Sequence, residues 1–443
     1  MFKFLAVVIP FVTLAMPAGA GGSQRELMFL ILIDAVRADH VGVYGYDKGT
    51  TPVLDELAKE GVRYARVYAN APWTAPSTAS FLTGLNASRH KTETDKSKLV
   101  GNVVTLTHRL KKAGWKTAGF SANGNGGSLR GLQSGFDVFR DTTNTYTKKE
   151  RGKTYNGLPT AEFLTRDVLD YLAKSTAPKE FVFIFYVDPH DPYNAPPELE
   201  KKFLGDYNGT IRRLPSWEKD NDYPKAERDA IVAIYDAGIY YADQQIGVLL
   251  DGLKKMGLRD KATVMISADH GEGFGEHNFY LHAHHFWDEV IHVPLIVVGP
   301  DFKVGVDERL TQSIDVTATL LELGGASPEG LLGHSLLQPA IGDRRIISEY
   351  NEYGIHRQAI IGERYKVIWQ RPADREWYMR SFSDKFTPAQ KMAFFPSVSF
   401  DKEVVWVFDL VADPAEKKDL SATIPDEAKK MLQELRLFVG NNP

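Results

Sequence analysis

The chain has 443 residues, of which 43% are hydrophobic and 25% charged, which is typical of a globular protein with one large α/β domain or two domains. Its 53 Lys and Arg residues are balanced by 57 Asp and Glu residues, and this net charge of −4 argues against a nucleic-acid partner. The absence of cysteine excludes disulfides, thiolate metal sites and a cysteine nucleophile.

The N-terminal residues 1–20 have the layout of a secretory signal peptide. A cationic start, MFK, precedes the apolar stretch FLAVVIPFVTLAM, and the small residues PAGAGG follow it. We expect cleavage after Ala20 and an exported protein, periplasmic or secreted. The apolar stretch is short for a membrane span, and no later segment offers one, so no transmembrane segment is expected in the mature chain. An uncleaved membrane anchor is the alternative.

Strand and helix patterns alternate over the first three quarters of the chain. Runs that are apolar on both faces predict buried parallel strands at 27–33, 181–187, 262–267 and 293–298. Helical patterns occupy 51–62 and 229–257. The alternation predicts an α/β fold, with a mainly parallel sheet sandwiched by helices.

The pattern changes after about residue 340. Short strand-like runs and a last amphipathic helix starting at Pro425 predict a small sheet-plus-helix subdomain packed on the main domain. We therefore expect a catalytic domain over 26–340 and a C-terminal subdomain over 341–443. The polar stretches 141–158 and 205–228 are predicted to be surface loops that rim a substrate opening.

Polar residues follow three of the predicted strands. Asp34 directly follows the first, Asp188-Pro189-His190 follows the second, and Asp269-His270 follows the third one residue further on. Ligands of open α/β sheets bind at the carboxyl ends of the strands. The sequence therefore predicts a site at this edge.

The stretch APWTAPSTASFLTG (71–84) contains a threonine ahead of a proline. Pro76 suits the first turn of a helix, so Thr74 is expected just before a helix N-terminus, where free N–H groups favour an anion. Thr74 could be a nucleophile for a phosphate or sulfate ester, or a simple helix cap.

Six of the 12 histidines lie between His270 and His292, in a glycine-rich segment. Asp269 and His270 are free to converge on a metal, and His282 and His284 point the same way if the segment is locally extended. A solvated loop with scattered histidines is the alternative.

Several ordered segments resemble the sulfatase family of the alkaline phosphatase superfamily. They are LIDAVRADHVGVYGY, APWTAPSTASFLTG, YVDPHDPY, ISADHGEGFGEH and HAHHFWDEVIHVPLIVVGP, and the resemblance runs from about residue 26 to 440. It implies an alkaline phosphatase-like fold and a metal-dependent ester hydrolase.

The resemblance also implies roles for individual residues. One divalent metal would be bound by four ligands: Asp34, Thr74, Asp269 and His270. His190 would face the substrate, His284 would protonate the leaving group, and His282 would lie beside it. Since the ligand set contains a nitrogen, Mn²⁺ or Zn²⁺ is plausible beside Ca²⁺ or Mg²⁺, which prefer oxygen.

The chain departs from the family at the nucleophile. The usual Cys-x-Pro-x-Arg reads Thr74-Ala75-Pro76-Ser77-Thr78, so no formylglycine can form and the arginine is lost. A basic Lys-x-His segment corresponds to SANGN, where Asn123 would offer the substrate a neutral hydrogen bond. Arg37 is expected to contact substrate or to form a local ion pair with Asp39. Trp73 would stack on the substrate or fill the core.

Threonine changes the expected chemistry. A formylglycine hydrate can expel sulfate by collapsing to the aldehyde, whereas an ester of threonine must be cleaved by water, which is readily pictured for phosphorus. We expect a metal-dependent hydrolase of sulfate or phosphate/phosphonate esters, with in-line attack by Thr74, acting on small-molecule, glycan or lipid-headgroup esters. The alternatives are a phospho-headgroup transferase and an inactive relative that binds anionic glycans.

Overall fold

The computed structural model describes residues 25–146, 160–193, 195–209, 224–392 and 394–440. The predicted signal peptide (1–20) and large parts of both predicted loops (147–158 and 210–223) lie outside the described residues. Among the helices within these ranges, not one combines the length and the apolar character that a membrane span needs.

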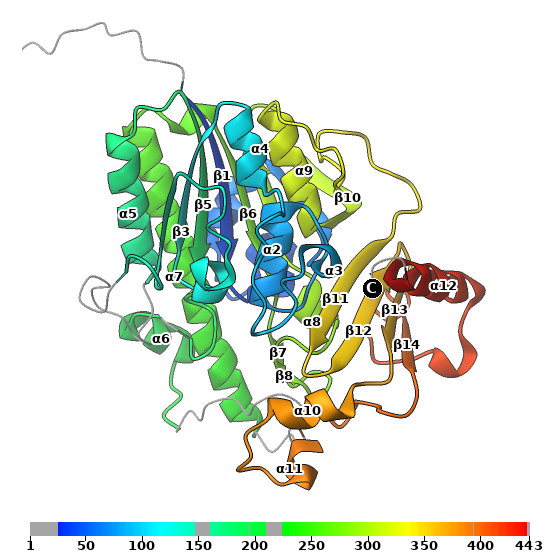
Figure 1. The fold of residues 1–443 in the computed structure, drawn as a ribbon. Coiled ribbons are helices and arrows are strands. Elements are labelled where there is room, and N and C mark those ends of the chain that lie inside the picture. The colour runs from blue at the N-terminus through cyan, green and yellow to red at the C-terminus, as the bar shows by residue number, and fades with distance from the viewer. Residues whose placement is uncertain (1–24, 147–159, 194, 210–223, 393, 441–443) are drawn as a thin grey trace, which may run out of the picture.

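An eight-stranded sheet forms the centre of the molecule, in the order β10-β2-β9-β6-β1-β5-β3-β4 (Figure 1). Its strands are β1 (Glu26–Ile33), β2 (Val62–Tyr68), β3 (Lys116–Ser121), β4 (Val138–Asp141), β5 (Lys179–Tyr186), β6 (Ala262–Ala268), β9 (Leu295–Val298) and β10 (Gly305–Gln312). From Leu27 to Ile33 every residue of β1 is buried, which explains its unbroken apolar sequence.

All strand pairs of this sheet are parallel except those of β9, which runs antiparallel to β2 and β6. The prediction of a mainly parallel sheet is confirmed, but the prediction of a parallel strand at 293–298 is wrong. The segment between β6 and β9 contains no long crossover helix and stays near the carboxyl edge of the sheet. The chain therefore re-enters the sheet from that edge and runs back along β6.

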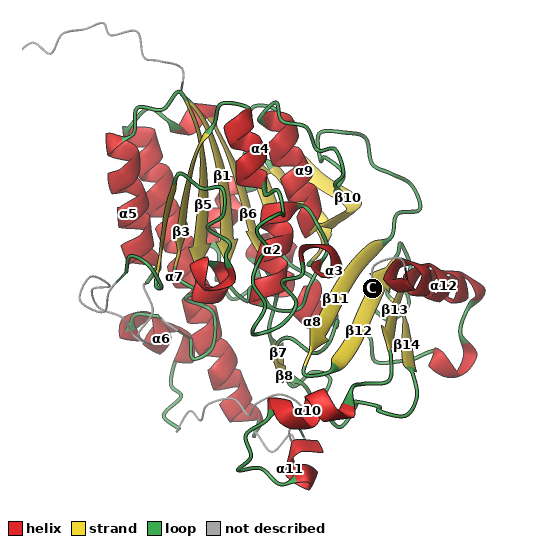
Figure 2. Ribbon diagram, viewed as in Figure 1, coloured by secondary structure: helices red, strands yellow, loops and turns green. Residues whose placement is uncertain are grey.

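Helices cover both faces of the large sheet (Figure 2). One layer contains α1 (Pro52–Leu57), α5 (Ala161–Lys174), α6 (Pro197–Leu204) and α7 (Lys225–Lys255). The other contains α2 (Thr74–Thr83), α3 (Ala87–His90), α4 (Leu106–Lys112) and α9 (Ser313–Leu323). Because α7 begins at Lys225, the last residues of the loop predicted at 205–228 are helical.

A second, antiparallel sheet lies beside the first and has the order β11-β12-β13-β14. Its strands are β11 (Ile346–Glu352), β12 (Ile355–Ile361), β13 (Tyr365–Gln370) and β14 (Val404–Asp409). The helix α12 (Asp426–Gly440) packs on one face, one residue after the predicted start at Pro425. The short helices α10 (Arg375–Ser381) and α11 (Pro388–Met392) lie between β13 and β14 in sequence.

The remaining short elements lie mostly in connections. The segment after β6 contains β7 (Gly273–Phe274), β8 (Tyr280–Leu281) and α8 (Asp288–Ile291). Single turns of 3-10 helix occur at Ala38–His40, Gly42–Tyr44, Gly124–Gly126, Ser128–Arg130, Arg259–Lys261 and Ser421–Thr423.

Candidate active site

Two neighbouring strands bring the predicted metal ligands together. β1 and β6 pair in parallel up to Ile33 and Ala268, so Asp34 and the dipeptide Asp269-His270 leave the sheet side by side. The His270 Nε2 atom lies 3.5 Å from Asp34 Oδ1 and 3.3 Å from Asp269 Oδ2, and all three side chains are fully buried. Their potential ligand atoms lie within 4.8 Å of one another, a spacing that suits a single ion.

Within this group, one oxygen of each carboxylate is already bonded and the other is not. Asp34 Oδ2 accepts from Asn123 Nδ2 at 2.7 Å, and Asp269 Oδ1 accepts from the N–H of Ala35 at 3.2 Å. Asp34 Oδ1 and Asp269 Oδ2 are buried without a hydrogen-bond partner. The His270 Nδ1 atom lies 2.9 Å from the Gly271 carbonyl and donates to it, which directs the Nε2 lone pair toward the carboxylates.

Burial sets the ionisation of this group. It raises the pKa of Asp34 to about 8 and, together with the charge of Asp34, holds the pKa of Asp269 well above its ordinary value. Burial also lowers the pKa of His270, which keeps the imidazole neutral. Two buried carboxyl groups and a neutral imidazole form a donor set for a cation, whose charge would favour the ionised carboxylates.

Thr74 lies next to the same group and contacts His270. Its Oγ1 atom is 3.2 Å from His270 Nε2, and the residue is 2% exposed. Thr74 is the first residue of α2, with Trp73 in the capping position, so the expectation that it precedes the helix is wrong by one residue. Ser77 Oγ donates to the Asp269 carbonyl at 2.6 Å, which fixes the first turn of α2 against the ligand segment.

His282 and His190 extend the group outward from the predicted metal ligands. The His282 ring packs on His270 with ring centroids 4.3 Å apart, and His190 meets His282 edge-on at 5.0 Å. His282 Nδ1 lies 3.0 Å from Glu272 Oε1, and His190 Nδ1 lies 2.6 Å from the carbonyl of Asp191. Burial, with the neighbouring His190, lowers the pKa of His282.

His284 is buried on a different side of this segment. Its Nδ1 atom lies 2.6 Å from the hydroxyl of Tyr350 on β11, so the small sheet supplies its partner. Burial lowers the pKa of His284. The condition of local extension, under which His282 and His284 would point the same way, is not met, because Leu281 and Ala283 have φ angles of 65° and 94°. His282 and His284 nevertheless line the same cavity.

The two predicted substrate contacts have partners within the protein. Arg37 forms ion pairs with Asp39, at 2.7 Å, and with Glu276, so the local ion pair expected from the sequence is present. The Asn123 amide donates to the carboxylate of Asp34, as described above. A contact of either residue with substrate stays a prediction.

Sequence reasoning missed Glu272 and Tyr350, the side chains that hold the two histidines. Glu272 lies within the motif ADHGEGFGEH, where its proximity to His270 was the available signal. Tyr350 lies 66 residues from His284, and no local pattern predicts their contact.

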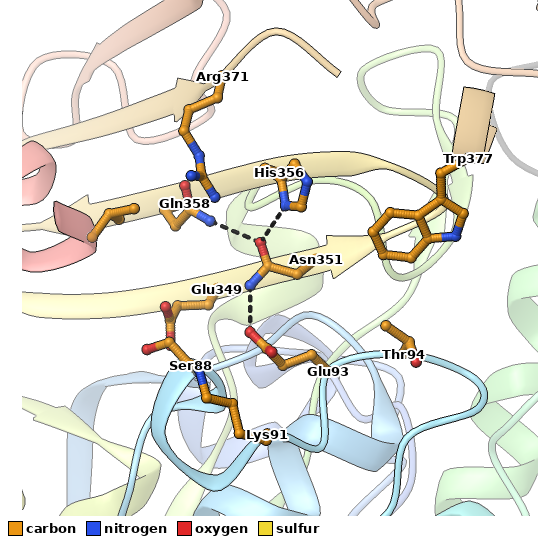
Figure 3. Close-up of a pocket in the computed structure, with 11 residues that line it drawn as sticks. Ser88, Lys91, Glu93, Thr94, Glu349, Asn351, His356, Gln358, Arg371 and Trp377 are labelled. Carbon is orange, nitrogen blue, oxygen red and sulfur yellow. Dashed lines mark hydrogen bonds between the residues drawn. The ribbon is translucent and has the colours of Figure 1, made fainter. Parts of the chain in front are cut away.

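Two cavities flank the small sheet. The cavity beside the histidines has a volume of about 180 Å³ and is lined in part by Trp73, which leaves that side chain at a cavity wall. A second cavity, of about 200 Å³, is lined by side chains that include Glu349 and Asn351 of β11 and Trp377 of α10 (Figure 3). Since side chains alternate along a strand, these two cavities lie on opposite faces of β11.

Comparisons with known proteins agree with this architecture. A sequence model of the sulfatase family matches residues 26–326. A Delta 4,5-hexuronate-2-O-sulfatase of Bacteroides thetaiotaomicron is 27% identical over 391 residues, which span 76% of this chain and 78% of that protein.

Solved structures share the fold over nearly the whole chain. A phosphonate monoester hydrolase of Agrobacterium radiobacter superposes with a TM-score of 0.73 at 19% identity, covering 94% of this chain and 95% of that one. A putative sulfatase from Bacteroides thetaiotaomicron has a TM-score of 0.69 at 21% identity, with 94% and 92% covered. Because the family match spans more than half of the chain, this protein belongs to the sulfatase family of ester hydrolases.

Proposed function

We propose that the protein is an exported, metal-dependent hydrolase of phosphate or phosphonate esters, in which Thr74 is the nucleophile and His284 the general acid. The observation that carries the proposal is the position of Thr74 Oγ1, 3.2 Å from His270 Nε2 within the group of buried ligands. A hydroxyl placed there lies at the start of a ten-residue helix, whose free N–H groups favour an anionic substrate.

The ligand group fits a divalent metal, which members of this family generally use. Asp34 Oδ1 and Asp269 Oδ2 lack partners, and His270 Nε2 faces both. A cation bound by these residues and Thr74 would balance the two carboxylates and lower the pKa of the Thr74 hydroxyl. The mixed oxygen and nitrogen donors suit Mn²⁺ or Zn²⁺ as well as Ca²⁺ or Mg²⁺.

The residues of the chain divide the reaction into two steps. In the first step, Thr74 Oγ1 gives its proton to water and attacks phosphorus in line with the departing oxygen, while His284 gives a proton to the departing alkoxide. In the second step, water attacks phosphorus, the Thr74 hydroxyl is restored and the phosphate or phosphonate anion is released. Burial lowers the pKa of His284, and an anionic ester bound beside it would raise that pKa again. Because Nδ1 of His284 is bonded to the Tyr350 hydroxyl, Nε2 is the atom that transfers the proton. His190, which is half-buried, is the second candidate for this proton.

Phosphorus is favoured over sulfur by the nucleophile itself. Thr74 cannot become formylglycine, so the esterified enzyme must be cleaved by water at the bound anion. One of the solved structures with this fold is a phosphonate monoester hydrolase, and its activity is consistent with a reaction at phosphorus.

A hydrolysis screen tests this function. The purified protein receives Mn²⁺, Zn²⁺, Ca²⁺ or Mg²⁺ in turn, with nitrophenyl phosphate, phosphodiester, phosphonate and sulfate as substrates. We expect turnover of phosphorus esters that Thr74→Ala abolishes and Thr74→Ser partly retains, and a phosphorylated Thr74 peptide in acid-quenched enzyme. Turnover of sulfate alone, or full activity in Thr74→Ala, contradicts the proposal.

Export is tested separately. The proposed signal peptide predicts a mature protein that begins at residue 21. Mass spectrometry of the protein recovered from the periplasm or medium of an expressing cell measures the N-terminus directly. Retention of Met1 in an otherwise active protein contradicts cleavage.

A further inference from the structure

The cavity of about 180 Å³ adjoins the reacting groups of the proposed mechanism. His282, whose ring packs on the metal ligand His270, lines it together with His284. Trp73, which also lines it, directly precedes Thr74. If His284 protonates the departing oxygen, the departing alcohol extends from His284 into this cavity.

The lining of this cavity combines aromatic rings with carboxylates. Trp73, Tyr350 and Tyr353 supply the rings, and Asp95 and Glu352 supply negative charge. No Lys or Arg is among the described residues that line it. Aromatic faces together with carboxylates attract a cation.

Glu352 is held in place by backbone N–H groups, and among the described residues no Lys, Arg or His forms an ion pair with it. It is 5% exposed, and its carboxylate accepts the backbone N–H groups of Asp95 at 2.5 Å and of Tyr353 at 3.2 Å. The positive charge of Arg130 acts on Glu352. The Arg130 guanidinium, however, donates to the Asp95 carbonyl and to the Asn125 side chain, and Arg130 does not line the cavity. Burial raises the pKa of Glu352 to about 7, and a cationic ligand would favour its ionised form.

We propose that this cavity binds the ammonium group of the departing alcohol, so that the preferred substrates are esters of small amino alcohols. This inference rests on the proposed function. The bond from Thr74 Oγ1 to phosphorus forms as the bond from phosphorus to the alcohol oxygen breaks, and the amino alcohol leaves with a proton from His284. The volume is below the range of about 300–1,000 Å³ typical for drug-sized ligands, which suits a small head group.

Two substrates of equal shape test the inference. Choline phosphate carries the ammonium, and 3,3-dimethylbutyl phosphate is its neutral counterpart. For the metal-loaded protein we expect kcat/KM to favour choline phosphate by about tenfold or more, as for a desolvated cation on aromatic rings. Glu352→Gln should bring this ratio close to one.

Glu349→Gln is the matched control. Glu349 lies on the same strand with a buried carboxyl whose pKa burial also raises to about 7, but it lines the cavity on the opposite face (Figure 3). Its substitution should preserve the ratio. If Glu352→Gln fails to fold, Asp95→Asn provides a second variant, since Asp95 is exposed.

The outcomes separate this inference from the proposed function. Hydrolysis of both esters without preference for choline phosphate overturns the inference and leaves the hydrolase function standing. If neither ester nor nitrophenyl phosphate is hydrolysed, the proposed function fails, and calorimetry then tests the cavity alone. Choline should bind and 3,3-dimethylbutanol should not, and equal binding of the two overturns the inference.

Amino-alcohol esters occur both as soluble esters and as lipid head groups. Release of choline from phosphatidylcholine vesicles, compared with its release from soluble choline phosphate, distinguishes the two sources. Faster release from vesicles supports ammonium recognition and assigns the lipid head group, whereas faster release from the soluble ester supports recognition of the free compound.

Discussion

Glu272 illustrates how one buried carboxyl group can hold a histidine that packs on a proposed metal ligand. Its Oε1 atom lies 3.0 Å from His282 Nδ1, while Oε2 is buried without a hydrogen-bond partner. Burial raises the pKa of Glu272 to about 8, so its charge depends on its surroundings. An acceptor at Nδ1 fixes the tautomer and the orientation of His282, as partners of metal-binding histidines do.

We expect Glu272→Gln to lower kcat by about 10–100-fold with little change in KM, because an amide holds the ring less firmly. Steady-state kinetics on nitrophenyl phosphate measures this. Glu289→Gln is the control, since Glu289 forms a similar pair with His277, 2.6 Å apart, outside the group around Thr74. An equal loss in both variants would mean that Glu272 acts only on stability.

The sequence predicts those site residues that can be recognised from their residue type and their position after a strand. Asp34 and Asp269-His270 were found because strand ends meet at one edge, and the structure brings them together. Contact of Asn123 with substrate stays a prediction, whereas the bond of its amide to Asp34 was not expected. That bond joins residues 89 apart, and only the folded chain defines it.

At the scale of elements, a side chain of α7 holds the start of α1. Asp243 accepts the N–H groups of Val53 and Leu54, each at 2.9 Å, whereas Thr51, in the capping position, makes no side-chain cap. A distant carboxylate therefore satisfies donors that a local cap would ordinarily take. Burial raises the pKa of Asp243 from 3.8 to about 7.

This shift predicts a pH dependence. Because the folded chain binds the proton more tightly than the unfolded chain, Asp243 contributes stability that is present below pH 4 and is lost as the pH rises through 7. Asp243→Asn should remove that contribution. Urea unfolding of both proteins from pH 4 to 8 should show the wild-type free energy falling more steeply than that of the variant. If the two unfolding free energies differed by the same amount at every pH, the raised pKa of Asp243 would be contradicted.

Lys366 of β13 joins the small sheet to the segment that carries the histidines. Its Nζ atom, fully buried, lies 2.5 Å from Asp288 Oδ1 and 2.9 Å from Glu416 Oε1. It also donates to the carbonyl of Phe286 at 2.9 Å. These contacts connect β13 to the segment that carries the histidines and to Glu416.

Lys366→Met should lower the free energy of unfolding by about 3–5 kcal/mol, because it leaves the buried Glu416 and the half-buried Asp288 without their cation. Chemical denaturation measures the loss. Lys59→Met is the control: Lys59 pairs with Glu56 on the exposed surface, where an ion pair contributes little. A small effect of Lys366→Met would mean that the carboxyl groups become protonated or reach water.

At the scale of the whole molecule, one hydrophobic core runs through both sheets. It includes Leu30 of β1 and Tyr350 of β11, and Tyr350 also reaches His284. The alternation of elements predicted the large sheet, and the change of pattern after residue 340 predicted the small one. Their mutual contact depends on side chains far apart in sequence, so the dependence of His284 on the small sheet was not predictable.

If the group of Asp34, Asp269, His270 and Thr74 binds a metal as proposed, the stability of the whole molecule depends on that ion. β1, β6 and α2 meet at Asp34, Asp269, His270 and Thr74, so a bound cation would stabilise the junction of three elements. At 100 times its dissociation constant, a metal that binds only the folded chain adds about 2.7 kcal/mol. We therefore expect Mn²⁺ or Zn²⁺ to raise Tm relative to EDTA-treated protein.

Asp34→Asn should abolish the rise in Tm with metal. Without metal, the variant should be more stable than the wild type. Since burial raises the pKa of Asp34 to about 8, metal-free wild type loses stability as the pH rises from about 4 to 8, and an amide avoids this loss. In EDTA the variant should therefore have the higher Tm at pH 8, with the difference shrinking at pH 5. Glu349→Gln, a buried carboxyl outside the ligand group, should keep the metal response. A metal response retained in Asp34→Asn would place the cation elsewhere.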